Sequence, residues 1–295
     1  MVQTPVTESA VPAAAKASRA GRDVPVAIGV GVAMAVGFSV PLFVFRPIVV
    51  VIISAAAAYG LLELVRALRV GGLRPPLVPL VVGGALTVAV GYPAGTEAVV
   101  AALLVTVLVA VAVRVAPDLG SRAGYDGQLL PDVAATVFAA VYVPFLAAFA
   151  VLLAAPADGP RRVFAFICTT VFSDIGGFAV GVLTGGRHKL APAISPGKSV
   201  EGFVGSLATC AVVGTLLLHF TLHVAVWQGV VFGLAMAVGA TLGDLGESAL
   251  KRDLGIKDMG ALLPGHGGLL DRLDSLLVCA PVAWLLLAAF APVGH

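Results

Sequence analysis

Long apolar runs separated by short polar segments dominate this sequence. Most of the runs approach the roughly 20 residues that an α-helix needs to cross the hydrocarbon core of a bilayer. The pattern predicts nine membrane-spanning helices, or eight if the first two runs, separated only by Arg46 and Pro47, form one broken helix. The runs fall at 24–45, 47–65, 77–93, 98–116, 133–155, 163–184, 202–222, 224–245 and 276–291.

Composition supports a membrane protein and excludes a soluble domain. Of the 295 residues, 59% are hydrophobic and 12% are charged, and the mean hydropathy is +1.05. A soluble domain carries roughly 25% charged residues, so hydrocarbon must be the solvent for much of this chain. We therefore expect an all-α, polytopic integral membrane protein. Cys168, Cys210 and Cys279 lie singly inside apolar runs, which predicts neither a disulfide framework nor a zinc site.

The basic residues of the loops predict how the chain is oriented. Short cytoplasmic loops are enriched in Lys and Arg. With nine spans and a cytoplasmic N-terminus, most basic residues fall on the inside, whereas Arg46, Arg161 and Arg162 fall outside. Arg161 and Arg162 form the one discordant pair. The inside residues are Lys16, Arg19, Arg22, Arg66, Arg69, Arg74, Arg114, Arg122, Arg187, Lys189, Lys198, Lys251, Arg252, Lys257 and Arg272.

Three regions differ in their content of polar residues. Residues 1–23 are polar and rich in alanine, which predicts a disordered cytoplasmic tail. Residues 24–160 carry most of their charges at span ends, so we expect scaffold helices and an oligomer interface there. Asp118, Asp126 and Asp132 are interpreted as loop residues rather than a metal site. Residues 161–295 form the expected catalytic region, with cytoplasmic loops at 185–201 and 246–275.

Charge is concentrated between Asp244 and Asp274. Asp244, Glu247, Ser248 and Lys251 recur at helical spacing, so they share one face of a helix that continues out of the eighth span. Asp271 and Asp274 are also three apart, at the mouth of the last span. Carboxylates held close together repel unless a cation lies between them, and oxygen ligands suit a hard ion such as Mg²⁺. The ten charged residues are Asp244, Glu247, Lys251, Arg252, Asp253, Lys257, Asp258, Asp271, Arg272 and Asp274.

A small-residue turn, Pro264-Gly265-His266-Gly267-Gly268, lies inside this stretch. Glycines let the backbone come close to a ligand. Four basic residues near the turn supply the positive charge that a triphosphate or a lipid phosphate needs. Basic groups with paired carboxylates favour metal-assisted phosphoryl or nucleotidyl transfer, although a long solvated loop could also be this charged. The basic residues are Lys251, Arg252, Lys257 and Arg272.

A second polar cluster lies upstream. Asp174 interrupts the sixth apolar run, and an ionisable residue at membrane depth is a functional candidate unless helix packing satisfies it. The segment 195–202, SPGKSVEG, contains a Gly-Lys-Ser sequence that resembles the end of a P-loop. It is not a P-loop, because Pro192 occupies the place of the first glycine of that motif. Lys198, Ser199 and backbone N–H groups at the start of the seventh helix can still bind phosphate.

These two clusters together resemble a known family. The segment SALKR from Ser248 is followed by Lys257-Asp258 and then by LPGHGGLLDRLD, which ends at Asp274. This arrangement resembles, without departure over 27 residues, the signature of the phosphatidate cytidylyltransferases, or CDP-diacylglycerol synthases. The segment 195–202 resembles the family's other loop, except that Gly197 stands where a second basic residue is common. The resemblance covers roughly 174–290; before that it is only the general look of a multi-span protein.

The resemblance implies roles for individual residues. Asp271, Lys251 and Asp244 would be catalytic. Metal binding would fall to Asp244, Asp271, Asp274 and Asp174. Substrate binding would fall to Arg187, Lys198, Ser199, Glu201, Ser248, Arg252, Lys257, His266 and Arg272.

The resemblance also implies an activity, in which CTP and phosphatidate give CDP-diacylglycerol and pyrophosphate with Mg²⁺ and a possible second cation. The active site would open to the cytoplasm of a bacterial cell. A nucleic acid partner is not expected, and the many small residues in the spans suit a homodimer. A transporter remains the main alternative, although we see no internal repeat; a membrane phosphatase or another lipid head-group transferase is the next.

Overall fold

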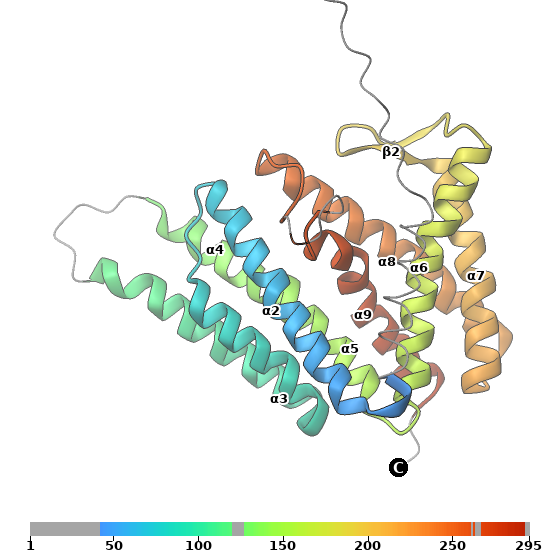
Figure 1. Ribbon diagram of the computed structural model, residues 1–295, viewed down its shortest axis with the longest axis horizontal. Helices are drawn as coiled ribbons and strands as arrows, with labels where there is room; N and C mark the ends of the chain where they lie inside the picture. Colours follow the sequence, from blue (N-terminus) through green and yellow to red (C-terminus); the bar gives the residue numbers. More distant parts are fainter. Residues whose placement is uncertain (1–41, 120–126, 261, 263–266, 293–295) are drawn as a thin grey trace, which may run out of the picture. The chain divides into compact units, whose positions relative to one another are not determined.

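The fold was described from a computed structural model, which covers residues 42–119, 127–260, 262 and 267–292. The predicted tail 1–23 and most of the first apolar run lie outside these residues. Helices make up almost all of the described chain (Figure 1). The elements are α2 (Arg46–Val70), α3 (Leu77–Leu119), α4 (Leu129–Ala140), the π-helical turn η1 (Val141–Phe145), α5 (Leu146–Ala154), α6 (Gly159–Leu183), β1 (Lys189–Ala191), β2 (Ser195–Ser199), α7 (Val200–Leu222), α8 (Val226–Asp253) and α9 (Leu270–Phe290).

The helices confirm an all-α, polytopic membrane protein. Within the described part of the chain, seven helical segments are long and apolar enough to cross a membrane. One of them joins α4, η1 and α5 into a single segment, Leu129–Ala154. The exact number of spans and the side on which the N-terminus lies stay predictions.

One of these segments, α3, consists of two helices that fold back on each other. Gly95 interrupts it with φ 71° and ψ −162°, a conformation that favours glycine. Thr87 Oγ1 lies 3.4 Å from Thr106 Oγ1, although a straight helix would separate these residues by about 28 Å. The predicted runs 77–93 and 98–116 are therefore two packed antiparallel helices.

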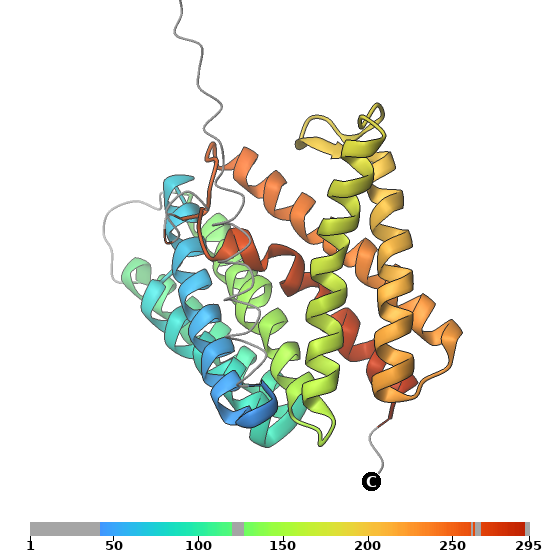
Figure 2. The same ribbon diagram turned by 45° about the vertical axis from the view of Figure 1, so that its right-hand side comes forward.

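Glycines allow α6, α7 and α8 to pack closely. A Cβ atom at Gly233 of α8 would come 2.1 Å from the backbone oxygen of Cys210 on α7, and one at Gly205 would come 2.8 Å from that of Gly176 on α6. Small residues serve the same purpose in membrane helices generally. Figure 2 shows α6 in front of α8 and α9, which pack against each other. The small residues of these spans are thus used within one chain, and a homodimer stays an untested prediction.

A short β-hairpin stands where the sequence predicts only a loop. Strands β1 and β2 pair in antiparallel fashion, with Lys189 opposite Ser199 and Ala191 opposite Ser195. Segment 185–201 is not helical, so its backbone N–H and C=O groups need other partners. The β1–β2 ladder supplies partners for some of them. The hairpin lies at the same end of the molecule as the α8–α9 connection (Figure 1), and a hydrogen bond from Arg252 Nε to Ile194 O joins the hairpin to the last turn of α8.

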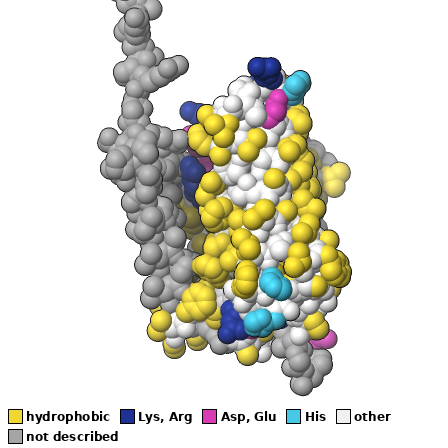
Figure 3. All heavy atoms as spheres, turned by 90° about the vertical axis from the view of Figure 1, so that its right-hand side faces the viewer, with side chains coloured by type: hydrophobic (Ala, Val, Ile, Leu, Met, Phe, Trp, Pro, Cys, Tyr) yellow, Lys and Arg dark blue, Asp and Glu magenta, His cyan; other side chains and the backbone are white. Residues whose placement is uncertain are grey.

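The polar residues gather at the ends of the helices. Figure 3 shows an apolar band across one face, with charged side chains at one end and histidine and basic side chains at the other. At the hairpin end of the bundle, Asp132 is fully buried in the first turn of α4, where it accepts a hydrogen bond from Arg74 N at 2.7 Å and forms a 2.7 Å ion pair with Arg114. Asp132 was expected in a loop, but it is a structural residue that holds α4 to α3 and to the residues that precede α3.

The discordant pair Arg161-Arg162 also has a structural explanation. Arg162 is 4% exposed and donates to Leu287 O and Ala291 O at the end of α9, and to Asp158 Oδ1 at 2.8 Å. The hydrogen bond from Arg162 lowers the pKa of Asp158. Arg162 is therefore needed as a cap for α9, whatever side of the membrane it faces.

Replacing Arg162 tests this explanation. Arg162→Ala leaves Asp158 and two helix-end carbonyls without their donor, so it should lower the free energy of unfolding by about 3 kcal/mol. Arg161→Ala is the matched control, because Arg161 is exposed and reaches Thr221 O only at 3.5 Å. Thermal unfolding in detergent measures the stability of the two purified variants. Equal stability of the two variants would contradict the capping role.

Candidate active site

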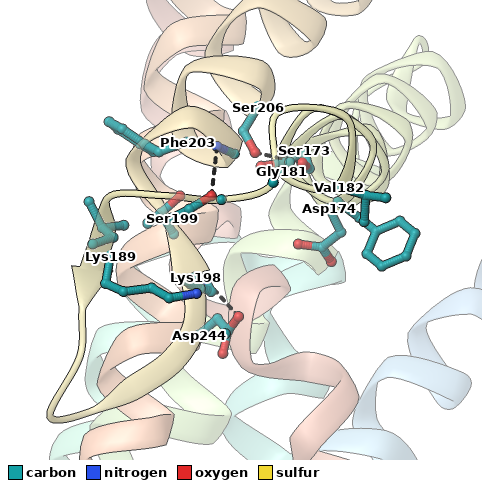
Figure 4. A pocket seen from close by; sticks show the side chains of 18 residues that line it. Ser173, Asp174, Gly181, Val182, Lys189, Lys198, Ser199, Phe203, Ser206 and Asp244 are labelled. Atoms are coloured by element: carbon teal, nitrogen blue, oxygen red, sulfur yellow. Dashed lines mark hydrogen bonds and ion pairs between the residues drawn. The ribbon is translucent and has the colours of Figure 1, made fainter.

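A pocket opens at the hairpin end of the bundle, between α6, β2, α7 and α8. Its volume is about 460 Å³. Figure 4 shows Lys198 and Asp244 on one side of it and Asp174 on the other. The lining residues are Ser173, Asp174, Gly177, Phe178, Gly181, Val182, Gly185, Gly186, Lys189, Leu190, Gly197, Lys198, Ser199, Gly202, Phe203, Ser206, Thr241 and Asp244.

The polar side of the pocket is built where β2 enters α7. Ser199 Oγ accepts a hydrogen bond from Gly202 N at 3.1 Å, so Ser199 caps the helix. The preceding Lys198 projects toward α8, where its Nζ lies 2.5 Å from Asp244 Oδ2. The other oxygen of Asp244 accepts a hydrogen bond from Ser248 Oγ at 3.3 Å. The predicted phosphate loop and the predicted carboxylate helix therefore meet directly.

Asp174 faces this polar side from α6. It lines the pocket together with Lys198 and Asp244, and it interacts electrostatically with both. Its neighbour Ser173 is buried and accepts, through its backbone oxygen, a 2.6 Å hydrogen bond from Ser206 on α7. This contact fixes the turn of α6 that carries Asp174. Asp174 is thus a residue of the pocket wall and not one that helix packing satisfies.

A second polar centre lies at the start of α9. Asp271 Oδ1 accepts from Lys251 Nζ at 2.8 Å, and Oδ2 accepts from Met259 N at 3.0 Å and Gly268 N at 2.8 Å. Lys251 also contacts Glu247 Oε2 at 2.7 Å, as expected for two residues one helical turn apart. The helical spacing predicted over 244–251 is confirmed, since α8 continues to Asp253.

Asp274 links the two centres. Its Oδ1 accepts from Ser275 N at 2.6 Å, and Ser275 Oγ donates to Ala240 O of α8 at 3.0 Å. Asp274 interacts electrostatically with Asp244 and Asp174. Carboxylates from α6, α8 and α9 therefore converge on one region.

Other predicted site residues lie outside the pocket lining. Arg187, Lys257 and Arg272 are exposed. Glu201 accepts from the backbone and the ring of His188, with a 2.7 Å contact to Nδ1, which fastens the base of the hairpin. Arg252 Nε donates to Ile194 O at 3.4 Å. His266 lies outside the described residues. The substrate-binding roles of these residues stay predictions.

The carboxylates of the site could serve as ligands of a magnesium ion only in part. Among the described residues, no three Asp, Glu, His or Cys side chains are placed to hold one ion together. Magnesium, however, is commonly bound through one or two carboxylates plus substrate phosphates, and Asp174 and Asp244 offer such oxygens at the pocket wall. Asp271 lies at the second polar centre, where its two oxygens accept hydrogen bonds from Lys251 and Met259, and its role as a metal ligand stays a prediction.

Glu63 escaped the sequence analysis. It is 2% exposed in α2, and its Oε2 accepts a hydrogen bond from Leu270 N at 2.8 Å, across 207 residues of sequence. The available signal was a glutamate inside the apolar run 47–65, since ionisable residues within spans mark functional or paired positions. Its partner, a backbone N–H, leaves no pattern in a sequence.

The fold and the pocket define a polytopic membrane protein with a lysine- and carboxylate-lined site suited to phosphate groups. The profile of the cytidylyltransferase family matches residues 25–290, and the chain belongs to this family. The resemblance noted between Asp174 and the last span therefore extends over nearly the whole chain. Family membership makes the protein a nucleotidyltransferase.

Curated relatives agree over most of the chain. A phosphatidate cytidylyltransferase of Mycobacterium leprae is 43% identical over 280 residues, which cover 91% of this chain and 89% of the relative. One of Mycobacterium bovis is 42% identical over 294 residues, 97% of this chain and 92% of the relative. One of Staphylococcus saprophyticus is 42% identical over 125 residues, 42% of this chain and 47% of the relative.

Proposed function

We propose that this protein is a phosphatidate cytidylyltransferase that transfers CMP from CTP to phosphatidate, giving CDP-diacylglycerol and pyrophosphate for phospholipid synthesis. The observation that carries the proposal is the pocket, whose wall is charged on one side and apolar on the other. Lys198 and Asp244 form the charged side, and Phe178, Val182 and Phe203 contribute apolar side chains. A site that binds both a water-soluble nucleotide and a lipid phosphate needs a charged side and an apolar side of this kind.

The apolar wall continues onto the outer face of α6. Phe178 is 76% exposed and Val182 is 62% exposed. In a bilayer these side chains face acyl chains, so a lipid can approach Asp174 and Lys198 from the side. CTP would enter from the hairpin end. This arrangement supports a reaction between a membrane substrate and a dissolved one.

The reaction itself needs positioning more than a base. A phosphate oxygen of phosphatidate attacks the α-phosphorus of CTP; the new P–O bond forms as the bond to the bridging oxygen of the β-phosphate breaks, and pyrophosphate leaves. The attacking oxygen is already anionic, so catalysis consists of orientation and charge neutralisation. Lys198 and the capped N-terminus of α7 bind phosphate oxygens. Asp271 holds Lys251 beside this region, at 2.8 Å.

The described lysines at the two polar centres are paired with carboxylates, Lys198 with Asp244 and Lys251 with Glu247 and Asp271. We infer that phosphate oxygens replace Asp244 as the partner of Lys198 when substrate binds. Asp244, Asp174 and Asp274 would hold Mg²⁺, with a possible second cation, and the metal would neutralise triphosphate charge.

The activity can be assayed directly. Purified protein incubated with labelled CTP, phosphatidate vesicles and Mg²⁺ should produce lipid-extractable cytidine and release pyrophosphate. Diacylglycerol vesicles in place of phosphatidate should give neither, because the nucleophilic phosphate is missing. A folded protein without product from phosphatidate would favour a transporter, a phosphatase or another head-group transferase.

Replacing Asp271 tests the second polar centre. Asp271→Asn removes the charge that holds Lys251, so turnover should fall by about 100-fold or more, while the protein still inserts and folds. Asp253→Asn is the control, because Asp253 is an exposed carboxylate at the end of α8, the helix that carries Lys251. Turnover in both variants is measured with the CTP assay. Normal activity in Asp271→Asn would remove Asp271 from the mechanism.

We also propose that the pocket faces the bacterial cytoplasm, where CTP is found. The hairpin end carries most basic residues of the described chain, and short cytoplasmic loops are enriched in such residues. Arg162, at the opposite end, is accounted for by its contacts with α9.

Cysteine labelling tests this orientation. Gly197→Cys places a thiol in β2, where an added Cβ meets nothing within 4 Å, and Ala225→Cys places one in the exposed α7–α8 connection at the other end. A membrane-impermeant maleimide should label Gly197→Cys only in inverted vesicles and Ala225→Cys only in right-side-out vesicles. The reverse pattern would place the pocket outside the cell.

A further inference from the structure

The start of α9 has an unusual cap. The helix begins at Leu270, and the side chain of Leu269 before it offers no hydrogen-bond acceptor. Glu63 of α2 supplies one instead, because its Oε2 accepts from Leu270 N at 2.8 Å. A negative charge at a helix N-terminus is favourable, since unpaired N–H groups and the helix dipole both point to it.

The segment before α9, which here means the described residues 259–260 and 267–269, packs around this carboxylate. A Cβ atom at Gly260 would come 2.0 Å from Glu63 Oε1, and one at Gly268 would come 2.8 Å from both carboxylate oxygens. No side chain larger than hydrogen fits at either position while Glu63 remains. Among the residues that the structure describes, Glu63 Oε1 is buried without a hydrogen-bond partner, and burying such an atom is costly.

The two glycines also connect Glu63 to Asp271. Gly268, which packs on Glu63, donates its N–H to Asp271 Oδ2 at 2.8 Å. Met259, which precedes Gly260, donates to the same oxygen at 3.0 Å. The other oxygen of Asp271 holds Lys251 at 2.8 Å. Glu63 therefore lies directly behind the backbone groups that orient Asp271.

We propose that Glu63 is a positioning residue for the active site: its buried carboxylate holds the segment before α9, and through it Asp271 and Lys251, in the geometry that the reaction needs. Helix α2 belongs to the half of the chain that was expected to be a scaffold. Through Glu63, it would also help to position the residues of the active site. The role in turnover rests on the function proposed above, whereas the contact itself does not.

Backbone amide exchange tests the contact in the full-length protein. Glu63→Ala should speed exchange at Leu270, Gly268 and Met259 by about tenfold or more, because the whole segment loses its anchor. Glu63→Gln, which keeps an acceptor oxygen for Leu270 N, should give a smaller rise. Faster exchange at Leu270 alone, with Gly268 and Met259 unchanged, would overturn the proposal, since Glu63 would then cap α9 without positioning Asp271.

Steady-state kinetics test the role in turnover. Glu63→Ala should lower kcat about tenfold or more, because small displacements of catalytic groups are costly, while KM for CTP stays within about twofold. Glu63→Gln should recover most of this loss. Asp132→Asn is the matched control, a buried carboxylate of the scaffold half that binds Arg74 N and Arg114 rather than the segment before α9.

The two assays separate the possible failures. Unchanged kcat per folded molecule in Glu63→Ala, or an equal loss in Asp132→Asn, would overturn the positioning role. A wild-type protein without turnover would refute the proposed function, and the exchange rates would still decide whether Glu63 holds the segment.

Discussion

The rest of the site depends on the hydrogen bonds that the carboxylate of Asp271 accepts. A charged group at the mouth of a membrane span is costly unless its charge and lone pairs are compensated. Asp271 is compensated by Lys251 from α8 and by the backbone of Met259 and Gly268 from the α8–α9 connection. The same contacts that make the charge tolerable therefore tie α8, the connection and α9 together. In the function proposed above, one set of hydrogen bonds would therefore serve both the stability of this region and the geometry of the site.

Close packing of α6, α7 and α8 brings Asp174 and Asp244 together at the pocket. Asp174 lies on α6 and Asp244 on α8, and they line one pocket because α6 and α8 both pack against α7 through glycines. A larger residue at Gly205 or Gly233 would push the helices apart by the width of its side chain. In hydrocarbon, where no hydrophobic driving force holds helices together, such complementarity is a main source of association. The small residues of the sequence thus determine where the charged ones meet.

The sequence predicted features that are local in the chain. The helical spacing of Asp244, Glu247 and Lys251 is visible in a few residues, and the helix is as expected. The contacts of Glu63 and Asp132 were missed because their partners are a backbone N–H of Leu270 and an arginine on another helix. Neither kind of partner can be recognised by spacing. The pairing of β1 with β2 was missed for a related reason, since the five residues SPGKS, which include a proline and a glycine, resemble a loop until their partner strand is known.

The charge balance of the site limits how substrates can bind. Two anionic substrates repel each other, and binding them requires free positive charge, yet Lys198 and Lys251 are already paired with carboxylates. These pairs keep the charges compensated when no substrate is present. Phosphate oxygens that take Lys198 leave Asp244 without its partner, and an unpaired carboxylate beside a triphosphate is unfavourable unless a cation arrives with it. In the function proposed above, nucleotide and cation binding would therefore be coupled, because each would remove the electrostatic penalty that the other creates.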